Sequence, residues 1–165
     1  MRTVYIGLQR GGGTVGLLNR LITRSRFGHA LIAFDDAAFS ADGREGWQFE
    51  RVSEISTATR WYTFAASSEQ IANMERWCQH RVGWRYDWVS VFKFTTLWRI
   101  FLPSRERRSD REKFFCSEGV YACPLEAAAI RLLGEVSAYE VAPGHFRFSS
   151  SLRLATPPTF RGLVL

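Results

Sequence analysis

The chain has 165 residues, of which 46% are hydrophobic and 15% aromatic, enough to bury a core and to exclude a disordered or fibrous protein. Its net charge of +6, carried almost entirely by arginine, suits an acidic partner or a solvated basic face. We expect a single domain over residues 1–165. Apolar runs are too short for a transmembrane segment, and the first residues lack a secretory signal, which predicts synthesis in the cytoplasm.

The first part of the chain predicts four strands, because short runs there are rich in β-branched and aromatic residues. A helix that Thr14 could cap is expected between the first two strands. The second strand is apolar on both faces, which is typical of a central strand, and a polar loop with Asp42 and Gly43 follows it. The strands are expected at residues 3–8, 28–34, 47–52 and 61–65, and the loop at residues 35–46.

The second part of the chain is mainly helical in prediction. Ser67 and Gln70 form a capping box at the start of one helix, whose apolar stripe includes Cys78. Asp87 is expected to cap a second helix, which is apolar nearly all round. This second helix is expected over residues 88–102 and a charged loop over 103–113. A third helix is expected to begin at Cys116, and Pro124 is expected to interrupt or end it. A strand is expected at residues 138–141.

The three cysteines are Cys78, Cys116 and Cys123, an odd number that cannot all pair within one chain. Cys116 and Cys123 are seven residues apart, so on one helix they lie about 10 Å apart, beyond disulfide reach. Cys78 is interpreted as a core residue. The sequence has no CxxC pair and no HxxxH, so we expect no metal site and no cofactor.

Cys116 and His29 are the candidate catalytic pair. A helix N-terminus and a nearby imidazolium both favour a thiolate, and Cys116 is expected to begin a helix. Each residue alone is more commonly a buried core residue than a catalytic one. Together they supply a thiol nucleophile and its base, in an order along the chain that is the reverse of papain's.

Several motifs share this order. They are Phe27–Ile32 around the histidine, Gly83-x-x-Tyr86-Asp87, Phe115–Glu118 around the cysteine, and the upstream segment Gly13–Thr23. Over roughly residues 5–125 the chain resembles the circularly permuted branch of the NlpC-type papain-like cysteine hydrolases, in particular the YaeF and YiiX group. The resemblance implies an α+β, permuted papain-like fold in which a small antiparallel sheet packs against a helical layer that carries the nucleophile.

The resemblance also implies residue roles. Cys116 is the nucleophile, His29 the general base, and a polar residue on the strand after the histidine strand orients the imidazole. We predict Glu50 for this third role, with Gln48 on the same strand face as the alternative. Tyr86, Gln48 and Ser117 are predicted to contact substrate. The residue before the histidine, often serine in this group, is Gly28 here.

The predicted function is a cysteine peptidase or amidase that cleaves an amide bond, in cell-wall peptide by resemblance, with delivery by a bacteriophage tail or a secretion system as a hypothesis. A lipid acyltransferase or esterase of the same fold is a second interpretation, with residues Trp88–Leu102 as its lipid contact or as a site for a partner protein. A third is a non-catalytic assembly module, which an occluded Cys116 would indicate. Nucleic-acid binding is disfavoured, because the arginines at 105, 107, 108 and 111 form one short loop without interleaved aromatics.

Overall fold

The computed structural model describes residues 2–11, 16–17, 20, 25–88 and 112–158. Three sequence predictions fall outside this part of the chain. They are the helix that follows Thr14, the apolar helix expected after Trp88, and the arginine-rich loop that precedes Glu112.

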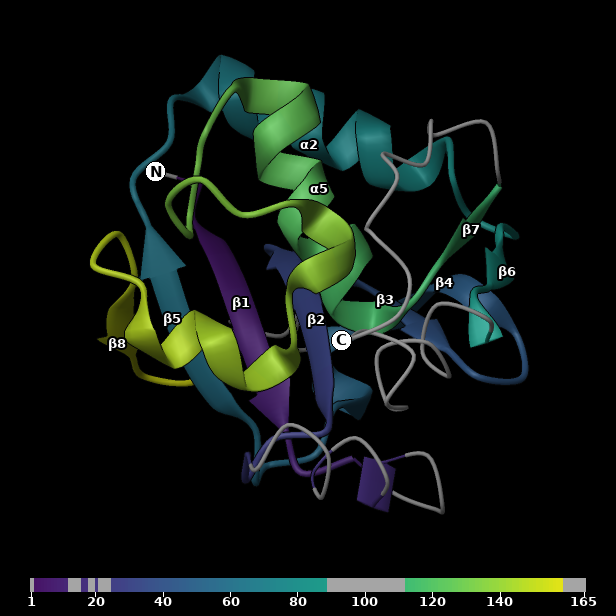
Figure 1. Cartoon of the computed structure of the whole chain (residues 1–165). Helices are drawn as coiled ribbons and strands as arrows, with labels where there is room; N and C mark the ends of the chain where they lie inside the picture. Colours follow the sequence, from purple (N-terminus) through teal and green to yellow (C-terminus); the bar gives the residue numbers. More distant parts are fainter. Residues whose placement is uncertain (1, 12–15, 18–19, 21–24, 89–111, 159–165) are drawn as a thin grey trace, which may run out of the picture.

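A six-stranded antiparallel sheet forms one layer, with strand order β4-β3-β2-β1-β5-β8 (Figure 1). The central strand predicted at 28–34 is β2, which lies between β1 and β3. A separate parallel pair, β6-β7, joins two short segments far apart in sequence. The strands are β1 (Val4–Gln9), β2 (His29–Phe34), β3 (Ala37–Asp42), β4 (Gly46–Arg51), β5 (Arg60–Phe64), β6 (Arg85–Tyr86), β7 (Lys113–Phe114) and β8 (Arg153–Ala155).

Two helices form the second layer, α2 (Ser68–Gln79) and α5 (Cys116–Ala128), and they lie against each other over one face of the sheet (Figure 1). The larger hydrophobic core lies between this face and the helices, and a smaller cluster around Leu31 and Trp61 covers the other face. The α+β class predicted from the sequence is confirmed, and the layers are consistent with a small permuted papain-like fold.

Two predicted elements are wrong. The segment interpreted as a polar loop after β2 contains the strand β3, because a tight turn at Asp35, with φ of 51°, returns the chain after two residues. The alanines of β3 face two packed layers, where small side chains fit although they have low strand propensity. The strand predicted at residues 138–141 is instead a short 3-10 helix, η2 (Ala138–Glu140); the others are η1 (Val52–Glu54) and η3 (Pro143–Phe148).

The capping box of α2 is confirmed. Ser67 Oγ accepts a hydrogen bond from the Gln70 backbone N–H at 3.1 Å, and the Gln70 side chain accepts one from the Ser67 N–H at 2.9 Å. The predicted break or end of the third helix at Pro124 is wrong: α5 continues through Pro124 to Ala128, and the C-cap residue Ala129 adopts a left-handed conformation with φ of 54°. It is buried along most of its length, so it occupies the centre of the larger core.

Trp47 of β4 fixes α5 against the sheet. Its indole is fully buried and its N–H donates to the Cys78 carbonyl at 3.1 Å. A Cβ on Gly119 would lie 2.2 Å from the Trp47 ring, so only glycine at this position of α5 permits the contact.

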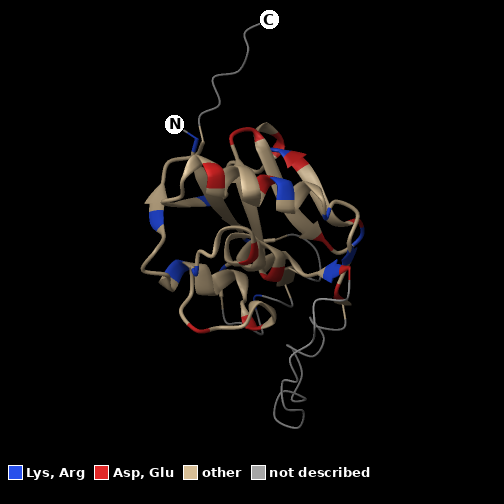
Figure 2. Cartoon of the chain, turned by 90° about the horizontal axis from the view of Figure 1, so that it is seen from above, with Lys and Arg blue, Asp and Glu red and all other residues tan. Residues whose placement is uncertain are grey.

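Acidic and basic residues are interspersed along the described ribbon (Figure 2). Eight of the 22 basic residues but two of the 16 acidic ones lie outside the described ranges, which accounts for the whole positive excess. The basic face proposed from composition therefore stays a prediction. Within the described part of the chain, no helix has the length and apolar character that a membrane span requires.

Candidate active site

Cys116 is the first residue of α5, as predicted, and only 1% of its surface is exposed. Phe115, in an extended conformation, precedes it as the N-cap residue and offers no side-chain acceptor to the helix. The first backbone N–H groups of α5 therefore lack a capping side chain, and those of Cys116 and Ser117 act to lower the pKa of the Cys116 thiol.

The electrostatic environment of the thiol combines two opposing effects. Burial raises the pKa of Cys116 to about 11, and backbone hydrogen bonds from Ala30, Ser117 and Cys116 itself oppose this rise. Burial has the larger effect, so the thiol is neutral at pH 7 in this arrangement. The hydrogen-bond donors around the sulfur are nevertheless those that would stabilise a thiolate if water or substrate entered.

The strand β2 brings His29 to the same place. His29 is its first residue, opposite Gln9 of β1, and the next residue, Ala30, has its backbone against the Cys116 sulfur. The fold thus places the thiol beside the chain at His29, across 87 residues of sequence. Both residues are described, and no hydrogen bond joins the ring to the thiol in this arrangement.

His29 is partly buried, and burial lowers its pKa from 6.5 to about 4. The negative charge of Asp42 acts in the opposite direction and raises it. At pH 7 the imidazole is therefore neutral, the form that a general base requires before it accepts a proton.

The influence of Asp42 follows from strand register. Strands β2 and β3 pair from Ile32 opposite Phe39 to Phe34 opposite Ala37. Strand β2 begins at His29 and β3 ends at Asp42, so the two residues lie toward the same end of these antiparallel strands, beyond the last paired residues. The sequence prediction omits Asp42 because it assigns β3 to a loop; alternation of Ala38, Ser40 and Asp42 is the signal that could have found it.

Glu50 and Gln48 lie side by side on β4, as their spacing predicted. Gln48 Nε2 donates to Glu50 Oε1 at 2.9 Å, and Ser40 Oγ of β3 donates to the same oxygen at 3.3 Å. Strand β3 lies between β4 and β2, so Glu50 is two strands away from His29.

The β6-β7 pair places a second group of residues next to the cysteine. Tyr86 is paired with Phe114, two residues before Cys116, and the Asp87 backbone N–H donates to the Phe114 carbonyl at 3.1 Å. Trp88 follows, with 42% of its surface exposed. Its indole N–H donates to the Gly43 carbonyl at 3.1 Å, and its ring lies 4.9 Å from that of Tyr86. The aromatic pair therefore bridges the β3–β4 turn beside Asp42 and the segment that leads to Cys116.

Ser117, predicted to contact substrate, is fully buried and its hydroxyl donates to the Val141 carbonyl at 2.6 Å. This bond ties the first turn of α5 to the chain after η2. The structure explains why residue 28 is glycine and not the serine common in the resembling group. A Cβ at Gly28 would lie 2.5 Å from the Gly16 carbonyl oxygen, so a serine at this position would displace the backbone before His29.

No protein-family model matches the chain, and no curated protein matches it. Among solved structures, it is similar in fold to the crystal structure of the metalloprotein YiiX from Escherichia coli O157:H7, a protein of the DUF1105 family. The TM-score is 0.66, and the similarity covers 94% of this chain and 96% of that one at 14% sequence identity. This defines an α+β fold of the YiiX kind.

That structural neighbour is described as a metalloprotein. In the described part of the present chain, no three His, Cys, Asp or Glu side chains gather closely enough to hold a metal ion.

Proposed function

We propose that the chain is a cysteine hydrolase that cleaves an amide bond through a thioester intermediate, with Cys116 as nucleophile and His29 as base. One observation carries this proposal. The Cys116 sulfur lies at the N-terminus of α5, among backbone N–H donors that include Ala30, the residue next to His29. No hydrogen bond joins the two groups in this arrangement, so the proposal requires the His29 ring to turn toward the thiol when the site opens; one proton transfer then produces thiolate and imidazolium together.

The reaction follows from that pair. His29 accepts the thiol proton as the Cys116 sulfur attacks the substrate carbonyl carbon, and the uncapped N–H groups at the start of α5 are placed to stabilise the developing oxyanion. The imidazolium then gives its proton to the leaving amine, and a thioester remains on Cys116. Water attacks the thioester while His29 takes up its proton, which releases the acid and restores the thiol.

We propose that Asp42 orients the His29 imidazole. This replaces the residue predicted from the sequence for that role, Glu50, and its alternative, Gln48. Glu50 was predicted as a polar residue on the strand after the histidine strand. In the structure that strand is β3, and Asp42 lies at the end of β3 that is nearer to His29. A carboxylate there would hold the imidazole and stabilise the imidazolium, since its charge already raises the His29 pKa.

The substrate class rests on the resemblance to the permuted NlpC-type hydrolases, which implies cell-wall peptide. The exposed face of Trp88, held next to Tyr86, adds a surface on which an apolar or sugar group of such a substrate could stack. Delivery to the envelope by a phage tail or a secretion system remains a hypothesis linked to this substrate.

Alkylation of Cys116 with iodoacetamide, followed by peptide mapping between pH 5 and 11, tests the proposed pair. If His29 activates the thiol, wild type should be labelled at Cys116 well below pH 8, and His29→Ala should lose that reactivity at least tenfold. Asp42→Asn should show an intermediate loss, and Glu50→Gln should label as wild type does. Equal, slow labelling in wild type and His29→Ala, rising only near pH 11, would contradict the proposal.

A second function is favoured by one observation, the burial of Cys116. A thiol that is 1% exposed and has a raised pKa is also what a non-catalytic assembly module would contain. The alkylation profile separates the two, because a core thiol follows its own raised pKa whether or not His29 is present. An active-site thiol depends on His29 and on opening of the site.

A further inference from the structure

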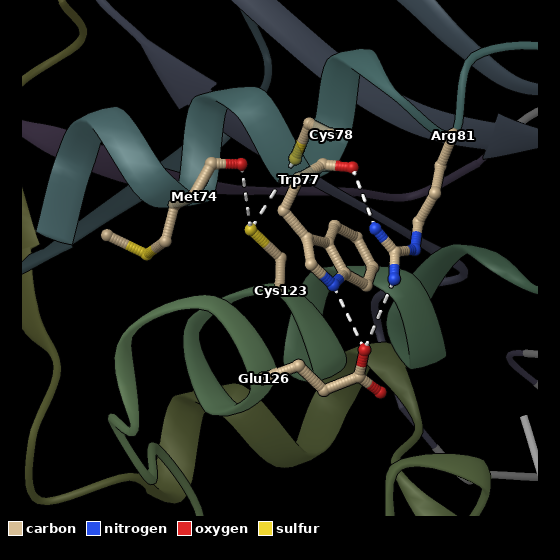
Figure 3. Close-up of polar contacts among 6 residues, drawn as sticks. All are labelled: Met74, Trp77, Cys78, Arg81, Cys123 and Glu126. Carbon is tan, nitrogen blue, oxygen red and sulfur yellow. Dashed lines mark hydrogen bonds and ion pairs between the residues drawn. The ribbon is translucent and has the colours of Figure 1, made fainter.

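Cys78 and Cys123 form a thiol pair away from the candidate active site (Figure 3). Cys78 lies in the last turn of α2 and Cys123 near the middle of α5, and both have no exposed surface. Their sulfur atoms are 3.5 Å apart, with the Cys78 thiol donating to the Cys123 sulfur. The Cys123 thiol donates in turn to the Met74 carbonyl at 3.5 Å.

The contact between α2 and α5 is fixed on one flank of this pair. Trp77 Nε1 donates to Glu126 Oε2 at 3.0 Å, and Arg81 Nη2 lies 3.6 Å from the same oxygen. The Arg81 guanidinium also stacks on the Trp77 ring at 3.9 Å (Figure 3). Because these contacts hold the two helices side by side, the two thiols stay neighbours without being bonded.

We propose that Cys78 and Cys123 form a disulfide that links α2 to α5 and leaves Cys116 as the free thiol of the chain. A disulfide requires sulfur atoms about 2.05 Å apart, so the pair must approach by about 1.5 Å. The two helices are already in contact, so side-chain rotation or a small shift of the helices must supply that approach. The proposal is independent of the function proposed above.

A disulfide such as oxidised glutathione is the required co-reactant. One thiolate attacks a glutathione sulfur and releases one glutathione thiol; the other thiolate then attacks the mixed disulfide and releases the second. The two cysteines are oxidised, and one oxidised glutathione becomes two reduced molecules. Burial raises the pKa of Cys78, so exchange in the folded chain is expected to be slow and to proceed through local opening of the α2–α5 contact.

The experiment incubates the purified full-length chain with oxidised glutathione, alkylates the remaining thiols in acid-quenched samples, and maps the peptides by mass spectrometry. We expect a loss of about 2 Da and a cross-linked Cys78–Cys123 peptide in wild type and in Cys116→Ser. Neither Cys78→Ser nor Cys123→Ser should form it. The oxidised chain should melt about 5 °C or more above the reduced one.

A second arm covers slow access to the buried thiols. The reduced chain is unfolded in urea and refolded with oxidised glutathione, and far- and near-ultraviolet circular dichroism is compared with the native protein. Recovery of the native spectrum together with the Cys78–Cys123 bond supports the proposal. Refolding with both thiols reduced, or with Cys116 paired to either of them, would overturn it.

Discussion

Helices α2 and α5 lie side by side, yet their N-termini are built differently. At α2, Ser67 and Gln70 satisfy each other's backbone groups in a capping box, and Gln70 Nε2 also donates to the Ala128 carbonyl of α5 at 3.1 Å. At α5, Glu118 accepts a hydrogen bond from the Phe115 N–H at 3.3 Å, but Phe115 offers no side-chain acceptor in return, and backbone N–H groups of Cys116 and Ser117 act to lower the pKa of the Cys116 thiol. The α2 start has both halves of its capping box, whereas the α5 start has only the half that Glu118 supplies and leaves its first-turn N–H groups without a side-chain acceptor, next to a thiol.

The difference teaches where the stability of each helix start comes from. A capped start is held by its own hydrogen bonds, worth about 1 kcal/mol. An uncapped start must be held by packing, and for α5 that packing includes the Trp47 ring against Gly119 and the Ser117 bond to Val141. This arrangement keeps donors available at Cys116, and the following experiments either break or sharpen the contrast.

The strongest way to break it is to remove the packing that holds α5. Trp47→Ala deletes a fully buried indole and its hydrogen bond to Cys78, so we expect a loss of about 3–5 kcal/mol in the free energy of unfolding. Urea denaturation followed by circular dichroism measures it. Trp47→Phe keeps part of the ring packing and should lose less. A loss below about 1 kcal/mol in Trp47→Ala would show that α5 is held by other contacts.

Acid should test the His29 side of the site. The pKa of His29 is about 4 in the folded chain and 6.5 when the ring is not buried, as in the unfolded chain. Between pH 4 and 6.5 the unfolded chain therefore binds a proton that the folded chain does not. The free energy of unfolding therefore falls as pH is lowered from 6.5 to 4, by about 2–3 kcal/mol at most, less for the exposed part of the ring.

Urea titrations across this pH range measure that fall. His29→Gln should flatten the profile, whereas the exposed control His80→Gln should keep the wild-type slope. A wild-type profile already flat between these pH values would mean that the ring is solvated, and an open site would then be the ground state.

Alkali should test the cysteine side. Because burial raises the folded pKa of Cys116 from 9.0 to about 11, the unfolded chain loses its thiol proton first as pH rises. Stability is complete below pH 9 and falls by about 2 kcal/mol up to pH 11. Cys116→Ala should remove that part of the slope, while the part due to Cys78, whose pKa is also raised, remains. An unchanged slope in Cys116→Ala would show that its thiol ionises freely in the folded chain.

Much of the fold follows from sequence because its signals are local. The central strand at 28–34, the Ser67 capping box and a helix starting at Cys116 all depend on neighbouring residues, and all are present. Strand β3 could not be predicted from the sequence, because alanine has a low strand propensity and the packing on both faces that favours a strand there comes from distant parts of the chain. The prediction of a strand at residues 138–141 was wrong for a similar reason. The alternation of this segment fits a strand, but no strand of the described chain pairs with it, and residues 138–140 form η2.

The candidate site shows the same limit more sharply. Cys116 and His29 could be proposed from their order and flanking residues, but the position of the sulfur against Ala30 is a product of tertiary packing. Asp42 could not be selected without β3, because its position near His29 depends on the antiparallel pairing of β3 with β2. The contact between Cys78 and Cys123 could not be predicted either, because residue spacing along a helix predicts contacts within that helix and not between α2 and α5.

The smallest expected effect on stability comes from removing the side-chain cap of α2. Ser67→Ala removes the acceptor for the Gln70 N–H and should cost about 1 kcal/mol in the free energy of unfolding, measured by urea denaturation. Ser68→Ala, at an exposed position one residue later, is the matched control and should cost much less. Because the cap serves α2 alone, alkylation of Cys116 at a fixed pH should proceed at the wild-type rate in both variants. A faster rate in Ser67→Ala would show that the α2 cap also holds α5 in place through Gln70 and Ala128, and the two helix starts would then act as one unit.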